Sequence, residues 1–161
     1  MRSLFPDWIF QSLARTQMSA YIQHSLWAFA ILETFHIMGL AILLGSIFLI
    51  NLTVLGVGLK KSPPALAREL APWMVFGLAL TLGSGIPMFM SSAIGYSLSD
   101  AMSIKLGLLT LAIVLQFVIH LVPGLEDGNV YGKTAAVVSM LCWFGVAWAG
   151  RAIAFPNLLG G

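Results

Sequence analysis

Long apolar runs alternate with short polar connections along this chain. The four runs extend from about residue 25 to 59, 72 to 98, 103 to 121 and 134 to 155. Each is long enough to cross a bilayer, because a hydrocarbon core of about 30 Å takes about 20 helical residues. The first run exceeds one span, so we expect its helix to tilt or to protrude from the membrane. The pattern predicts four transmembrane helices.

The connections between the runs carry turn-forming glycine, proline, serine and aspartate. They read KKSPPALAREL, GYSLSDAMS and PGLEDGNVYGK. Short connections make consecutive helices antiparallel neighbours, so the expected fold is all-α, an up-down-up-down four-helix bundle. We expect residues 1–161 to form one integral membrane domain.

The first 20 residues are rich in aromatic side chains but contain no unbroken apolar run. Pro6 suits the first position of a helix, where its missing N–H would have no partner. In a helix that starts there, Trp8, Ile9 and Leu13 can share one face. We therefore expect residues 1–20 to form an amphipathic helix that lies in the membrane interface.

Composition narrows the class of protein. Of the 161 residues, 59% are hydrophobic and 9% are charged, which is too apolar for a soluble domain of this size. The net charge of +2, without a cluster of Lys and Arg, excludes nucleic acid as the expected partner. The single cysteine, Cys142, cannot pair within the chain, and we interpret it as a small buried hydrophobe.

Small residues within the runs predict where helices touch, because membrane helices associate by close approach of their backbones. These residues are Gly39, Gly45, Ser46, Gly77, Gly83, Gly85, Gly145 and Gly150.

Basic residues predict the orientation, because cytoplasmic loops carry an excess of Lys and Arg. One side of the membrane holds Lys60, Lys61, Arg68 and Lys133, and the other holds Arg2, Arg15, Lys105 and Arg151. We discount Lys105 and Arg151, which lie inside a span or at its edge. The side of Lys60 is then the cytoplasmic side, and both termini are expected on the opposite side.

Four ionisable residues interrupt the apolar spans at one predicted depth. Glu33 and His36 lie near the outer end of the first span, Lys105 near the outer end of the third and Arg151 near that of the fourth. A structural interpretation is an ion-paired cluster that fixes the bundle. A functional interpretation is that Lys105, Arg151 and His36 hold an anion, such as a lipid phosphate, a haem propionate or a carboxylate substrate.

A second polar set is predicted towards the inner side. Asn51 in the first span and Gln116 and His120 in the third fall at a similar depth. They can form a buried hydrogen-bond set with a neutral histidine, or His120 can serve as a metal or haem ligand.

Histidines in a four-helix membrane bundle raise the question of b-type haem, which takes axial ligands at one depth. His36 and His120 differ in depth by roughly 20 Å, and His24 lies about 18 Å from His36 along one helix, at about 1.5 Å per residue. No pair of histidines in the chain is suitable. A haem b would need Met88 or Met90 on the second span as second ligand, a ligand from another chain, or a different number of helices.

The runs ETFHIMGLAILLGSIFLINLTVLG, PWMVFGLALTLGSGIPMF, SIKLGLL and AGRAIAFP together resemble a bacterial family of small four-helix integral membrane proteins of unknown function. The matching polar positions are Glu33, His36, Lys105, His120 and Arg151. The family often carries Asp and Arg where this chain has Asn51 and Thr53, so an inner ion pair is missing here. The resemblance implies a fold but no activity. With the orientation predicted from the basic residues, we expect a location in the bacterial inner membrane with both termini in the periplasm. More distantly, the layout is similar to membrane anchors of redox enzymes and to copper-resistance membrane proteins.

These observations favour a non-catalytic membrane subunit or anchor within a larger complex, for which a redox complex is one candidate. The alternatives are an electron-transfer cytochrome with b haem and a protein that binds or transports an anionic lipid or metabolite at the outer cluster. We find no metalloprotease motif, phosphate-binding loop or Ser–His–Asp arrangement, so no catalytic residue is assigned. The expected partners are the lipid bilayer and other membrane subunits or further copies of the chain.

Overall fold

A computed structural model of the chain describes residues 6–58, 60–97, 99–121 and 129–154. These residues are all-helical, as the sequence predicts. The helices are α1 (Asp7–Ala14), α2 (Gln17–His24), α3 (Ala28–Val54), α4 (Pro63–Ser91), α5 (Ala93–Ser97), α6 (Asp100–Leu121) and α7 (Val130–Ala154). Among them, α3, α4, α6 and α7 are long and apolar enough to cross a membrane. The protein is thus a membrane protein built on a helical bundle with four candidate spans.

Helix ends differ from the predicted ones where the sequence gives mixed signals. α4 begins at Pro63, so two turns that read as a connection are helical. Prolines fit there because the first helical N–H groups have no partner within the helix. α3 ends at Val54, ahead of Gly56 and Gly58, whose φ angles of 82° and 111° suit glycine.

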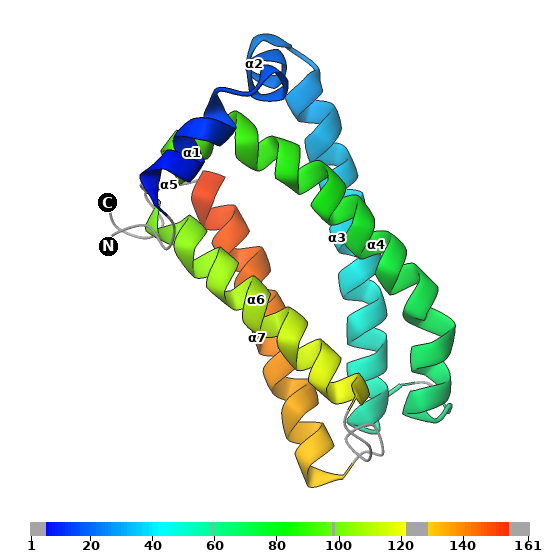
Figure 1. Cartoon of the computed structure of the whole chain (residues 1–161). Helices are drawn as coiled ribbons and strands as arrows, with labels where there is room; N and C mark the ends of the chain where they lie inside the picture. Colours follow the sequence, from blue (N-terminus) through cyan, green and yellow to red (C-terminus); the bar gives the residue numbers. More distant parts are fainter. Residues whose placement is uncertain (1–5, 59, 98, 122–128, 155–161) are drawn as a thin grey trace.

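The bundle consists of two helix pairs. α3 packs along α4, and α6 packs along α7 (Figure 1). α3 and α7 join the two pairs, whereas α4 and α6 do not contact each other in the described residues. The fold is therefore a bundle that is open between α4 and α6.

Glycines set the close approach of α3 and α4. A Cβ atom built on Gly39 would lie 2.6 Å from Oγ1 of Thr81, and one on Gly77 would lie 2.7 Å from the backbone nitrogen of Leu43. Gly45 and Gly83, also expected at contacts, have no atom within 4 Å of such a Cβ. That expectation is wrong for these two glycines, because each lies on a helix face that no neighbour covers.

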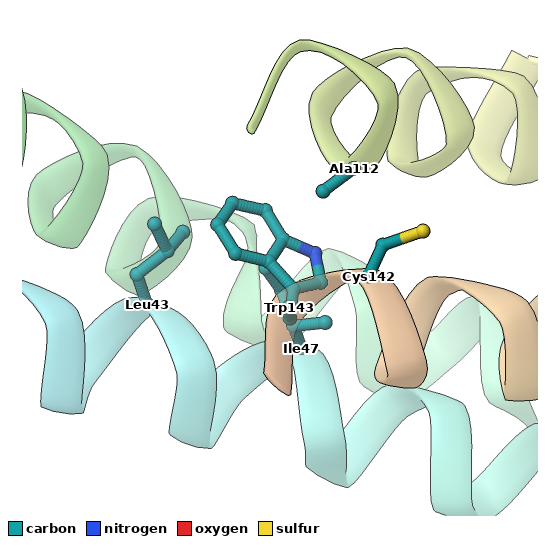
Figure 2. Close-up of a cluster of buried hydrophobic side chains, with 5 residues drawn as sticks. All are labelled: Leu43, Ile47, Ala112, Cys142 and Trp143. Atoms are coloured by element: carbon teal, nitrogen blue, oxygen red, sulfur yellow. The ribbon is translucent and has the colours of Figure 1, made fainter. Parts of the chain in front are cut away.

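The two pairs meet at a buried apolar cluster around Trp143. Its indole lies against Leu43 and Ile47 of α3 and near Ala112 of α6, with Cys142 beside it on α7 (Figure 2). Cys142 is free and buried, in agreement with the sequence interpretation. This cluster fixes α7 against α3 at mid-depth.

The N-terminal segment forms two short helices at the end of the bundle where α5 also lies (Figure 1). Thr16 caps α2 by accepting a hydrogen bond from the backbone nitrogen of Ser19. Ser19 and Gln23 then donate to the carbonyl oxygens of Met90 and Ser91, at 3.0 and 2.6 Å. We call this end of the bundle the N-terminal end and the opposite end, which holds residues 55–58 and 60–62, the loop end.

Candidate functional site

His36 is held by α4 from across a helix–helix contact. The half-buried imidazole has its Nδ1 2.9 Å from the carbonyl oxygen of Thr81 and 3.3 Å from Oγ of Ser84. A carbonyl oxygen only accepts, so Nδ1 carries the proton and donates. The neutral ring then has its lone pair on Nε2, which leaves that nitrogen able to accept a hydrogen bond or bind a metal.

Gly85 provides the space for this imidazole. A Cβ on Gly85 would lie 2.8 Å from Cε1 of His36 and 3.1 Å from its Nδ1. The ring therefore lies directly on the α4 backbone, and any side chain at residue 85 would push it away. The orientation of His36 depends on a glycine as much as on its hydrogen bond.

Lys105 approaches the same region from the other helix pair. It is partly buried on α6, and its ammonium lies 3.5 Å from the place that a Cβ would take on Gly150 of α7. Its charge is close enough to act on His36. Among the side chains that the structure describes, none forms an ion pair or a hydrogen bond with Lys105. We call His36, Lys105, Gly85 and Gly150 the His36–Lys105 site.

The remaining members of the predicted outer cluster are placed as follows. Glu33 is exposed on α3, near enough for its charge to act on His36, but it forms no ion pair with Lys105 in the described part of the chain. Arg151 follows Gly150 in α7, and its side chain lies outside the described residues. The structure thus brings Lys105 towards His36, and no acid among the described side chains pairs with Lys105.

The inner polar set is a hydrogen-bond chain through three helices. Nδ2 of Asn51 donates to Oγ of Ser139 at 3.3 Å, and that hydroxyl donates to Oε1 of Gln116 at 3.2 Å. All three side chains are buried. Sequence reasoning placed Asn51 and Gln116 at one depth but missed Ser139, whose signal was only a small polar residue at the matching depth of the fourth span. The side chain of His120 is not among those described.

Met88 lies on α4, three positions beyond Gly85. No hydrogen bond or ring contact joins it to His36 in the described residues. Within the same residues, no group of three or more His, Cys, Asp or Glu side chains gathers as a metal site would require.

A lateral cleft of about 540 Å³ opens where α4 and α6 separate. Leu43, Ile47 and Trp143 lie at its wall together with Leu78 of α4 and Phe117 of α6. Arg68, near the start of α4, also lines it. Sequence reasoning did not find this cleft, because it depends on the spacing of the two helix pairs rather than on any residue pattern.

Comparison with known proteins gives one match. A family described as a family of unknown function (DUF6644) matches residues 10–156, in agreement with the resemblance to a family without an assigned activity. No curated protein matches the chain. No solved structure matches it either. Any function must therefore be argued from the geometry above.

Proposed function

We propose that this chain, which belongs to the DUF6644 family of unknown function, is a non-catalytic membrane subunit that binds an anionic group at the His36–Lys105 site. The observation that carries the proposal is the Lys105 ammonium, which lies partly buried in a membrane-spanning helix with no acid beside it among the described side chains. A charge within a span costs about 2.5–3.5 kcal/mol at mid-bilayer and less near the interface. A bound anion offsets that cost.

The two side chains suit an acid that carries one proton and one negative charge. Lys105 offers only donors, so it takes the anionic oxygen. His36, with Nδ1 committed to Thr81, offers Nε2 as an acceptor for a hydroxyl. A phosphate monoanion presents both groups, and a carboxylate presents the first. The proposed ligand class is therefore a phosphate or carboxylate head on a membrane-soluble molecule.

Thermal unfolding of the purified protein in neutral detergent tests this proposal. The probes are dodecyl phosphate, dodecanoate and the neutral alcohol dodecanol, which share one alkyl chain. Saturation at 100 times the dissociation constant stabilises a protein by about 2.7 kcal/mol. We expect the two acids, but not the alcohol, to raise the apparent Tm of the wild type.

The matched variants are Lys105→Gln and Lys133→Gln. Lys133 is an exposed lysine near the start of α7, at the opposite end of that helix from Gly150. Lys105→Gln should abolish the stabilisation by acids, and Lys133→Gln should retain it. Equal stabilisation of wild type and Lys105→Gln would contradict the proposal.

A second candidate function, b-type haem binding, is favoured by the hydrogen bond of His36. A metal-binding histidine usually donates its other ring nitrogen to a carbonyl or carboxylate, which is the arrangement of His36 and Thr81. The described residues thus offer one oriented imidazole, and the second ligand would be Met88 or a residue of another chain. A bound haem would supply one-electron transfer.

An absorption spectrum of protein from haem-supplemented cells tests the haem candidate. We expect a reducible Soret band in the wild type and in His24→Ala, which removes an exposed histidine of α2, and its loss in His36→Ala. A wild-type spectrum without that band removes the haem candidate and leaves anion binding to be tested separately.

The subunit role rests on how little of the described chain lies outside the spans. The segment before α3 adds exposed aromatic side chains, among them Trp8 in α1, Tyr21 in α2 and Trp27 at the N-cap of α3. Exposed apolar surface of this kind is typical of contacts with partners or lipid. Native mass spectrometry after extraction in mild detergent should find the chain with another membrane protein, and a stable monomer with no associated protein would contradict the subunit role.

A further inference from the structure

The lateral cleft lies at the loop end of the bundle, away from the His36–Lys105 site. Along α4 it extends from Pro64 to Leu78, about 21 Å at 1.5 Å per residue. One leaflet of the hydrocarbon core is about 15 Å thick, half of a core of about 30 Å. Along α4 the cleft is therefore longer than one leaflet is thick, so it begins outside the hydrocarbon core and extends into it.

The mouth of the cleft lies at headgroup level. Trp73 is 57% exposed on α4, and exposed tryptophans mark the membrane–water interface. Arg68 precedes Trp73 by five positions, about 7.5 Å along the helix towards the loop end. This places the guanidinium of Arg68 among lipid phosphates.

No described side chain pairs with the charge of Arg68. Its sequence neighbour Glu69 pairs with Lys61, with Nζ of Lys61 2.6 Å from Oε2 of Glu69. Arg68 is exposed, lines the cleft and has no ion pair or hydrogen bond among the described side chains. The pairing of Lys61 with Glu69 thus leaves Arg68 as a cation at the mouth of an apolar cleft.

The shape of the cleft and the charge at its mouth favour one occupant. The cleft of about 540 Å³ has a largely apolar wall, which suits a slender apolar chain. The exposed Arg68 at its mouth suits an anionic group at the end of that chain.

We infer that the cleft binds one acyl chain of an anionic membrane phospholipid, whose phosphate meets Arg68. The apolar wall takes the chain, and the guanidinium takes the phosphate in a charge-assisted contact. This site is separate from the proposed function at His36 and Lys105 and involves the opposite end of the bundle.

Native mass spectrometry of the full chain with equimolar phosphatidylglycerol and phosphatidylcholine, carrying the same acyl chains, tests the inference. We expect the wild type to retain phosphatidylglycerol about fivefold over phosphatidylcholine, the factor that one basic side chain contributes near an anionic membrane surface. Arg68→Gln should remove the preference. Lys60→Gln, which removes an exposed lysine outside the cleft and leaves the pair of Lys61 and Glu69 intact, should keep it.

A second variant tests the cleft itself. Ala71 lines the cleft and is exposed, so Ala71→Phe fills the cleft without entering the core. This variant should lower retention of both lipids at least fivefold with an unchanged helical circular dichroism spectrum.

The inference is overturned by equal retention of the two lipids in the wild type, by a preference that survives Arg68→Gln, or by unchanged retention in Ala71→Phe. Displacement of phosphatidylglycerol by equimolar oleate would also overturn the phospholipid assignment. Lys105→Gln separates this result from the proposed function, because it should not change lipid retention in the cleft.

Discussion

The Nδ1 atom of His36 lies 2.9 Å from the carbonyl oxygen of Thr81, so a side chain of α3 is fixed by the backbone of α4. The bond joins the two helices of one pair at the level where Lys105 approaches from the other pair. It also leaves Nε2 of His36 for a ligand. The functional proposal depends on this combination of a fixed imidazole and an ammonium without an acidic partner among the described side chains.

Removal of the imidazole should weaken the α3–α4 pair. His36→Ala loses one hydrogen bond and leaves the contact with Gly85 empty, so we expect a loss of about 1–2 kcal/mol in the free energy of unfolding. Unfolding by denaturant in detergent measures it. His24→Ala, at an exposed position of α2, serves as control and should change stability by less than about 0.5 kcal/mol. Equal stability of the two variants would show that the bond contributes nothing.

The glycine contact of α3 and α4 gives a prediction with a built-in control. Gly77→Ala places a Cβ 2.7 Å from the backbone nitrogen of Leu43, which forces the helices apart. Overpacking of this kind costs about 1–3 kcal/mol. Gly83→Ala, on the same helix with no atom within 4 Å, should be neutral or stabilising, because alanine favours helix by about 0.8–1 kcal/mol. A loss of the same size in both variants would contradict the packing described here.

Removal of one hydroxyl from the hydrogen-bond chain of Asn51, Ser139 and Gln116 should lower the free energy of unfolding. Ser139→Ala removes the hydroxyl that accepts the hydrogen bond from Nδ2 of Asn51. A buried polar group without a partner costs about 1–3 kcal/mol, so the variant should unfold at lower denaturant concentration. Thr110→Ala removes a hydroxyl that bonds only within its own helix at an exposed position, and it should have little effect. Equal midpoints for wild type and Ser139→Ala would show that the chain is not a stabilising network.

The residue at position 85 affects both the contact between α3 and α4 and the orientation of His36 in the His36–Lys105 site. Gly85→Ala places a Cβ 2.8 Å from Cε1 of His36, so the ring must move away from Thr81. We expect the variant to weaken binding of dodecyl phosphate at least threefold while the protein stays folded. Gly45→Ala, at a glycine with an open face, should bind as the wild type does. Unchanged binding by Gly85→Ala would mean that the orientation of His36 is irrelevant to the ligand.

The four spans could be predicted from the length of the apolar runs alone, because only long apolar helices can cross the hydrocarbon core of a membrane. The glycine contacts could be predicted only in part. Gly39 and Gly45, like Gly77 and Gly83, are six positions apart, which turns them about 240° around the helix. Both members of such a pair cannot face one neighbour, and the sequence does not say which member does.

The alternating direction of the helices was enough to predict the membrane depth of the polar residues. It was not enough to predict the lateral distances between them. Depth depends on position along a helix, but the approach of Lys105 to His36 depends on helix rotation and on which pairs touch. The role of Ser139 and the cleft at Arg68 were missed for the same reason. Pro63 and Pro64 misled the prediction of the α4 start, since they suit both a connection and a first helical turn.

The most direct test of anion binding is titration calorimetry of dodecyl phosphate into the wild type, Lys105→Gln and Lys133→Gln. A hydrogen bond to a charged group contributes about 1.5–3 kcal/mol, so Lys105→Gln should bind about 10- to 100-fold more weakly, and Lys133→Gln should bind as the wild type does. Equal dissociation constants for wild type and Lys105→Gln would contradict the account.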